Sequence, residues 1–196
     1  WPNRGPAPTA ASHMPVLPSA ADTGLTDEEM NEHHKHGVEL FLQNIENPIT
    51  EGSGMQDAEW TMDGDVRVFE LTASEIEWEV TPGMKLPAMA YNGMVPGPTL
   101  RCVEGQPIRV ILKNDMTQST AIHWHGQKVP NGMDGVPFIT QEPVRPGETF
   151  TYEFTPDPAG THMYHSHHNS TEQVGKGLLG AFIVEPADPR DRKSVV

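Results

Sequence analysis

The chain has 196 residues, and 27 acidic against 13 basic side chains give it a formal net charge of −14. This charge argues against a nucleic-acid binder, because neutralising phosphates requires clustered Lys and Arg side chains, and it disfavours anionic membrane surfaces. No stretch approaches the roughly 18–20 consecutive apolar residues of a membrane span, and the length suits one domain of roughly 100–150 residues with a tail.

The N-terminal third predicts little regular structure apart from one helix. Residues 1–25 are rich in Pro, Ala and Ser without an apolar period, which is typical of an extended or disordered leader. A capping box of Thr26 with Glu29, followed by apolar residues at helical spacing, predicts one short helix over 26–45. Gly, Ser and Asp in 48–64 indicate a linker, so that 26–64 form a helix and linker.

Three histidines lie on this predicted helix. His33, His34 and His36 form an HHKH cluster that offers metal ligands. Solvated polar side chains on a helix surface are the favoured interpretation, and the role of the cluster is left open.

From Val66 onward the chain is built of short β-rich segments separated by Pro and Gly turns. The segments are VRVFELTAS, EIEWEV, TLRCVE, PIRVILKN, TFTYEF and GAFIVEP. Such spacing predicts an all-β fold, a Greek-key sandwich or barrel that fills residues 65–187. The polar residues 188–196 then read as a linker toward another domain.

Six of the ten histidines lie between His123 and His168, and four of them form two His-x-His pairs. His123 and His125 flank a tryptophan, and His165 and His167 flank a serine. Residues i and i+2 of a strand project from the same face, so two neighbouring strands about 4.8 Å apart would converge four imidazoles on one patch. Four imidazoles favour copper or zinc. One such pair alone is more often an ordinary strand feature, but two in one β domain favour a metal site.

The other histidine, cysteine and methionine side chains give weaker indications of a metal site. Strand parity places His168 on the face opposite His165 and His167, so His162 and His168 are expected beside the site or exposed to solvent. Cys102 cannot form an internal disulfide alone and is expected to be a small buried hydrophobic residue. The methionines are scattered, which favours core and loop filling over a thioether site for cuprous ion.

These motifs resemble the multicopper oxidases, the family of laccases and cuprous oxidases. The resemblance covers most of residues 66–186: residues 91–114 resemble the family's opening-domain signature, and HWHG and HSH resemble its first two copper motifs. It implies a cupredoxin fold and a three-copper cluster that reduces O₂ to water, with electrons from a separate mononuclear blue copper.

The resemblance also implies roles for single residues. His123 would bind the type 2 copper, His125 and His165 one type 3 copper, and His167 the other. Asp134 lies where the family places a carboxylate linked to proton delivery, and a plain turn residue is an equally weighted alternative, because Asp-Gly is a turn signal.

Several departures from the family pattern limit what this chain can do alone. A blue copper site needs a thiolate with two histidines and an axial Met, but Ser166 replaces the cysteine, and Leu178 or Leu179 replaces the methionine. The Cys of the family's TQCP segment is replaced by Glu142. We therefore expect copper of types 2 and 3 without a type 1 site in this chain.

The resemblance implies eight histidines for the cluster, and the two motifs supply four. A second cupredoxin domain, in the same chain or in a neighbouring subunit of a homotrimer, is the expected partner. The sequence thus predicts a copper-dependent, laccase-like oxidoreductase that uses O₂ and a reducing substrate. A copper-binding cupredoxin domain without oxidase activity is the alternative, and a structural remnant without metal is a third possibility.

The reducing substrate is left open, with phenols, metal ions and amines as candidates. Trp1 in place of an initial Met indicates a processed chain or part of a longer product. Together with the resemblance, it predicts a secreted or periplasmic location.

Overall fold

The computed structural model of this chain describes residues 26–46, 56–81, 84–188 and 190. Predictions about 1–25, 47–55 and 191–196 lie outside these residues. The chain divides into two compact units, residues 1–47 and 48–196, which are described separately. The bounds of the predicted domain, 65–187, stay a prediction.

The first unit contains helix α1 (Asp27–Glu46), close to the predicted 26–45. The capping box is confirmed: the Thr26 N–H donates to Glu29 Oε2 at 2.8 Å, and the Glu29 N–H donates to Thr26 Oγ1 at 3.3 Å. The described helices include none with the length and apolar character needed to cross a membrane.

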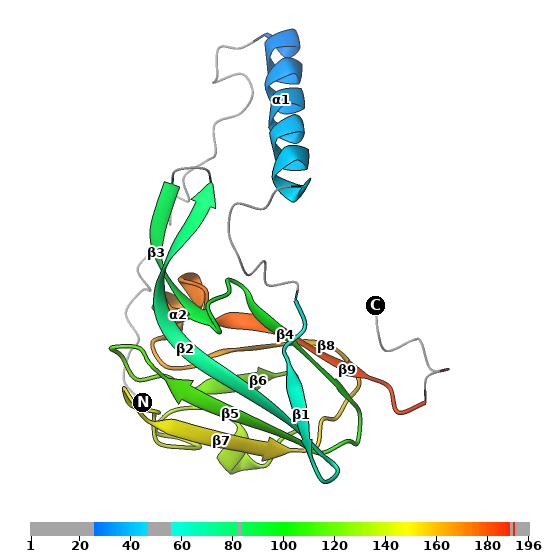
Figure 1. The fold of residues 1–196 in the computed structure, drawn as a ribbon, viewed down its shortest axis with the longest axis vertical. Helices are drawn as coiled ribbons and strands as arrows, with labels where there is room; N and C mark the ends of the chain where they lie inside the picture. The colour runs from blue at the N-terminus through cyan, green and yellow to red at the C-terminus, as the bar shows by residue number, and fades with distance from the viewer. Residues whose placement is uncertain (1–25, 47–55, 82–83, 189, 191–196) are drawn as a thin grey trace, which may run out of the picture. The chain divides into compact units, whose positions relative to one another are not determined.

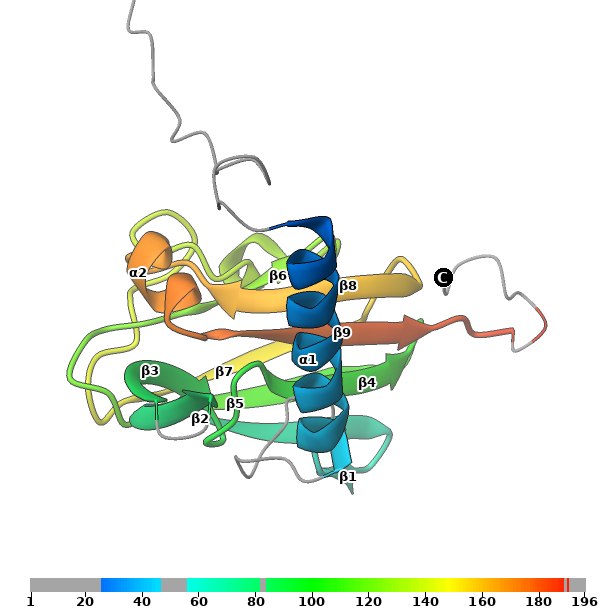
Figure 2. The same cartoon turned by 90° about the horizontal axis from the view of Figure 1, so that it is seen from above.

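The second unit is a sandwich of two β-sheets (Figures 1 and 2). One sheet has the order β1-β2-β5-β7 with β3 paired to β2, and the other has the order β4-β9-β8-β6. The strands are β1 (Trp60–Asp63), β2 (Val66–Thr81), β3 (Met84–Tyr91), β4 (Gly97–Val103), β5 (Ile108–Asn114), β6 (Ile122–His125), β7 (Thr149–Phe154), β8 (Gly160–Ser166) and β9 (Leu179–Glu185).

This arrangement confirms the predicted all-β fold. Strands β2 and β5 are parallel, as are β4 and β9, and the other pairs are antiparallel. Over the described residues the two sheets do not join into a barrel, so of the two predicted architectures the structure has the sandwich.

Strand β2 differs from the prediction of two separate strands. It runs through 16 residues without a break, because its first half pairs with β5 and its second half pairs with β3. The alternation of apolar residues changes phase in its middle: Phe69 and Leu71 are buried in the sandwich, whereas Val80 is 47% exposed. A change of phase signals a new face, and here the same strand leaves the sandwich and continues as a two-stranded ribbon with β3.

Four elements were not predicted, one of them the 3-10 helix η2 (Asn131–Met133). Strand β1 lies in the region interpreted as linker. Strand β3 contains Pro87 and is flanked by turn residues, which obscured its strand pattern. Helix α2 (Ser170–Gly175) follows the second histidine pair. A proline is tolerated in β3 because an edge strand leaves backbone N–H groups free of a ladder.

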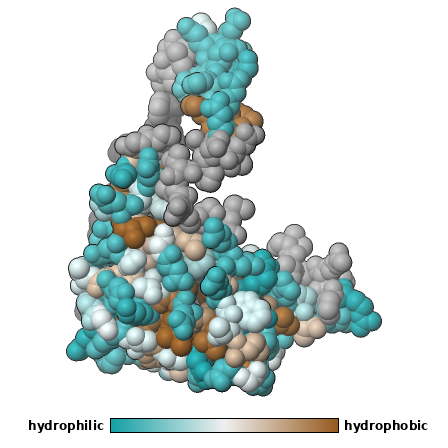
Figure 3. Space-filling view, viewed as in Figure 1, coloured by the Kyte–Doolittle hydropathy of each residue, from teal (hydrophilic) through white to brown (hydrophobic). Residues whose placement is uncertain are grey.

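Trp124 lies at the centre of the core. It is fully buried, and its ring lies 4.9 Å from Phe154, 5.4 Å from Tyr152 and 5.6 Å from Phe182, measured between centroids. These partners come from both sheets, so the tryptophan packs the sheets together. Burying an aromatic side chain of about 200 Å² is worth up to about 5 kcal/mol. The face of this unit seen in Figure 3 is mostly hydrophilic or intermediate, with small hydrophobic patches.

Candidate metal centre

Two neighbouring strands present the predicted histidine pairs. Strands β6 and β8 are antiparallel neighbours, with His123 directly opposite His165 and Trp124 opposite Tyr164. Because Trp124 and Tyr164 point into the core, the alternation of side chains turns His123, His125 and His165 to the other face of the sheet. The burial of the aromatic residues thus orients the imidazoles.

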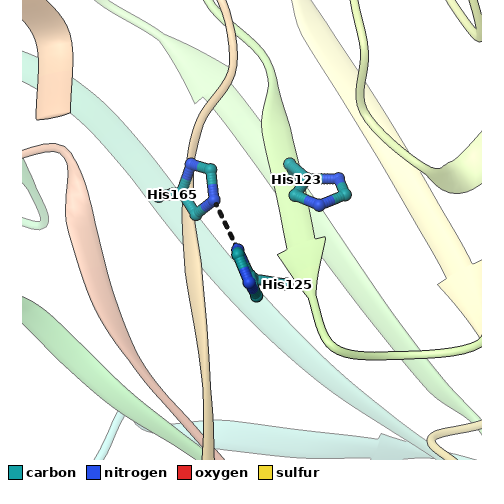
Figure 4. Close-up of side chains that lie close together, drawn as sticks. All are labelled: His123, His125 and His165. Atoms are coloured by element: carbon teal, nitrogen blue, oxygen red, sulfur yellow. Dashed lines mark hydrogen bonds between the residues drawn. The ribbon is translucent and has the colours of Figure 1, made fainter. Parts of the chain in front are cut away.

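The imidazoles converge as the spacing predicts (Figure 4). One ring nitrogen from each of His123, His125 and His165 lies within 4.8 Å of the others. Among the described residues, this is the one group of three or more histidine, cysteine or acidic side chains arranged to hold a metal ion. The ring of His167, which follows the end of β8, lies 5.4 Å from that of His123 between centroids. All four predicted side chains therefore lie together, three of them as a compact group.

Backbone carbonyls hold two of these rings. The Nδ1 atom of His123 lies 2.7 Å from the carbonyl oxygen of Asp134, and Nδ1 of His165 lies 2.9 Å from that of Ser166. A carbonyl only accepts hydrogen bonds, so each Nδ1 carries the hydrogen. The Nε2 atom of His123 then keeps its lone pair free, as in histidine ligands that a carbonyl orients toward a metal. The Nε2 atom of His165 accepts a hydrogen bond from Nδ1 of His125 at 3.4 Å, which Figure 4 draws as a dashed line.

The surroundings of His165 favour its neutral form. Burial lowers the pKa of His165, the neighbouring rings of His123, His125 and His167 lower it further, and the bond to Ser166 opposes these effects. Neutral imidazole is the form that binds a metal. His125 and His167 are exposed, so one side of the group is open to the surroundings.

Asp134 contacts the site in two ways. Its backbone oxygen accepts the His123 bond, and its carboxylate Oδ1 lies 3.4 Å from the same Nδ1. The next residue, Gly135, explains how the loop comes so close: it has a φ of 77°, and a Cβ there would lie 1.7 Å from the Ile122 carbonyl oxygen. The backbone at Asp134 and Gly135 therefore lies against β6, where the Asp134 carbonyl holds the ring of His123.

The other histidines stay outside the group. His162 donates from Nε2 to the Pro158 carbonyl at 3.1 Å. His168 is half-buried, and its buried Nδ1 has no hydrogen-bond partner. The helix residues His33, His34 and His36 are exposed.

Two residues predicted to stand in place of blue copper ligands lie in the interior. Ser166 and Leu178 are fully buried. Cys102 is also fully buried, in β4, with Sγ 3.8 Å from the Ile183 carbonyl, and burial raises the pKa of its thiol to about 12. This confirms its prediction as a buried hydrophobic residue, while the absence of a type 1 site stays a prediction.

Gln173, a fully buried amide in α2, is a further residue near the site that was not predicted from the sequence. Its Oε1 lies 2.5 Å from the hydroxyl oxygen of Ser166, the residue between His165 and His167. A polar residue just after a histidine motif gives no signal of burial, because only the turn of the chain through α2 brings it back under β8.

The donor set suits copper. The compact group offers imidazole nitrogens without a thiolate or carboxylate ligand, which is a preference of copper and zinc. Backbone carbonyls already orient the rings of His123 and His165, whereas the hydrogen bond between His125 and His165 would have to open for both rings to bind a metal.

Comparison with known proteins agrees with this geometry. The family model described as multicopper oxidase matches residues 72–189. Copper resistance protein A of Escherichia coli is 39% identical over 132 residues, which cover 65% of this chain and 21% of that protein. Laccase ustL of Ustilaginoidea virens is 40% identical over 124 residues, covering 61% and 18%.

Solved structures are also similar. The multi-copper oxidase from Pseudomonas thermotolerans aligns with a TM-score of 0.63 and 42% identity, over 65% of this chain and 31% of that one. The present chain spans about a fifth of the length of the curated relatives that it matches. Because the family model covers more than half of its residues, and the fold and the histidine motifs agree with that match, the chain belongs to the multicopper oxidase family.

Proposed function

We propose that this chain supplies four histidines of a trinuclear copper cluster in a laccase-like, copper-dependent oxidoreductase that reduces O₂ to water. The observation that carries the proposal is the convergence of His123, His125 and His165, with the ring of His167 beside them. The Nδ1–H groups of His123 and His165, both held by backbone carbonyls, support it, because they leave Nε2 of each ring as the atom with a lone pair to offer. The Nε2 of His165 would exchange its hydrogen bond with His125 for a metal.

Each side chain has a role in this proposal. His123 would hold the type 2 copper, His125 and His165 one type 3 copper, and His167 the other. Copper, when bound, supplies the one-electron steps by which electrons from a reducing substrate reach O₂. The Asp134 carboxylate, 3.4 Å from His123 Nδ1, would hold or pass a proton beside the site.

The proposal includes a partner. The exposed faces of His125 and His167 leave room for the remaining histidines, which a second cupredoxin domain would supply, in the same polypeptide or from a neighbouring subunit of a homotrimer. The blue copper that accepts electrons would also lie outside this chain. A secreted or periplasmic location belongs to the same proposal.

Copper titration of the 196-residue chain tests the site. We expect Cu(II) to bind with the electron paramagnetic resonance signature of several imidazole nitrogens. His123→Ala with His165→Ala should abolish this signal, whereas the matched pair His33→Ala with His36→Ala, on exposed helix positions, should leave it intact. Equal binding by both double variants would contradict the proposal.

A copper-binding domain without oxidase activity is the second candidate. The observation in its favour is that three imidazoles converge within this chain without any partner. The two candidates differ in O₂ consumption: an electrode measurement with a phenol, an amine or a reduced metal ion shows turnover only if the cluster is completed. A chain that binds no copper would instead indicate a structural remnant.

A further inference from the structure

A buried polar cluster lies directly behind the histidines. Its members are Gln173, Ser166 and Thr120, all three fully buried. The Ser166 hydroxyl donates to Gln173 Oε1 at 2.5 Å, and the Thr120 hydroxyl donates to the same oxygen at 3.0 Å. The amide Nε2 of Gln173 donates to the Ser119 carbonyl at 2.8 Å and to Gln118 Oε1 at 3.2 Å.

These partners determine the orientation of the amide. If the amide were turned over, Oε1 would face the Ser119 carbonyl, which has no hydrogen to donate. In the observed orientation, the oxygen accepts from two hydroxyls and the nitrogen donates twice, so the hydrogen-bonding capacity of the side chain is fully used. A buried amide satisfied in this way fixes its surroundings rather than merely filling space.

The cluster connects the two segments that carry the metal ligands. Ser166 separates His165 from His167, and its backbone pairs with Ile122, the residue before His123. Thr120 lies three residues before His123 on the segment that enters β6. One amide group therefore joins the end of β8 to the start of β6.

Helix α2 holds the amide in place. The Leu178 N–H donates to the backbone oxygen of Gln173 at 2.9 Å, and the Ser166 N–H donates to that of Leu178 at 3.0 Å. The Ser166 hydroxyl oxygen also accepts the N–H of His168 at 3.2 Å. The chain on both sides of His167 is thereby tied to Gln173 through short hydrogen bonds.

We propose that Gln173 is a positioning residue, which sets the separation between the histidines of β6 and those of β8. This inference rests on the proposed function, because the separation matters only if the four imidazoles share a metal centre. Gln173 touches no ligand ring itself and acts through Ser166 and Thr120.

The test compares three variants of the full chain by copper titration and electron paramagnetic resonance. Gln173→Leu keeps the volume but removes the bonds, and we expect copper affinity to fall about 10- to 100-fold with altered hyperfine splitting. Gln173→Glu keeps an oxygen for the two hydroxyls but turns a second oxygen to the Ser119 carbonyl, so copper affinity should fall in this variant as well. Asn114→Leu, at another buried amide that forms its hydrogen bonds with Gln118, Val144 and Met116 and none with Ser166 or Gln173, controls for lost stability.

A triple variant separates positioning from stability. Gln173→Leu with Ser166→Ala and Thr120→Val also removes the hydroxyls, and replacing both partners of a hydrogen bond by apolar groups restores much of the lost stability. We expect the copper signature to stay altered in this variant although unfolding by urea returns toward the native midpoint. A native signature in the triple variant or in Gln173→Leu would overturn the inference.

A copper-independent measurement keeps the two proposals distinguishable. Nuclear Overhauser effects between the rings of His123 and His165, 5.3 Å apart between centroids, should weaken in Gln173→Leu and persist in Asn114→Leu. A native chain that binds no copper would overturn the proposed function, and unchanged ring contacts in Gln173→Leu would overturn the positioning role by themselves.

Discussion

Gly135 offers a sharp test of how the loop after the first histidine pair holds the site. With a φ of 77°, a Cβ at this position would lie 1.7 Å from the Ile122 carbonyl oxygen and 2.4 Å from its carbon. Both are backbone atoms, so Gly135→Ala forces the loop away from β6 by more than about 1 Å, because packed atoms tolerate no such overlap.

The expected cost has two parts. The left-handed backbone costs a non-glycine residue about 1–2 kcal/mol, and overpacking adds about 1–3 kcal/mol. The total, about 2–5 kcal/mol, is a large share of the stability of about 5–15 kcal/mol of an ordinary domain. The displacement also carries the Asp134 carbonyl away from His123 Nδ1, now 2.7 Å away, so copper affinity should fall as well.

Urea unfolding followed by tryptophan fluorescence measures the loss of stability. The matched control is Gly147→Ala, where φ is 81° but a Cβ would meet nothing within 4 Å. It should cost only the backbone part, about 1–2 kcal/mol, and leave copper binding unchanged. Equal losses of stability and equal copper affinities in the two variants would refute the reasoning.

Three further outcomes are expected. Trp124→Ala should lower the free energy of unfolding by about 3–5 kcal/mol, because it leaves a cavity between the two sheets; a loss under about 1 kcal/mol in urea would contradict its central place. Cys102, buried and with a thiol pKa of about 12, should resist Ellman's reagent at pH 8 and react fully once urea unfolds the chain; rapid labelling of the folded chain would show an accessible thiol. Thr26→Ala removes the hydroxyl that accepts the Glu29 N–H and should cost helix α1 about 0.5–2 kcal/mol, seen as faster amide exchange in its first turn; unchanged exchange would mean that the capping box contributes nothing.

The sequence predicted best what local patterns control. Helix α1 has a capping box and a helical period, and the structure places its ends within about a residue of the prediction. The His-x-His pairs were assigned to one face each because strand alternation is a local rule. Strands β1 and β3 were not predicted because turn residues lie next to them. Each is recognised as a strand only through its pairing with β2.

The residues that support the site were less accessible to prediction. Asp134 was singled out for its carboxylate, yet its backbone oxygen makes the shorter contact with His123, and no sequence pattern encodes a carbonyl's direction. Gln173 belongs to a short polar segment that gives no signal of burial. Its burial depends on how α2 folds back beneath the end of β8.

By itself, the sequence determined the all-β class, the pairing of imidazoles within each motif and the family, because side-chain alternation and motif spacing are properties of a few consecutive residues. Only the tertiary structure decided that β6 and β8 are neighbours in register, with His123 opposite His165. It also decided that the Asp134 carbonyl holds the ring of His123 and that the buried amide of Gln173 bonds to Ser166. Those contacts join residues 7 to 42 positions apart in the chain, and their free energy comes from packing two sheets around Trp124, which no local pattern specifies.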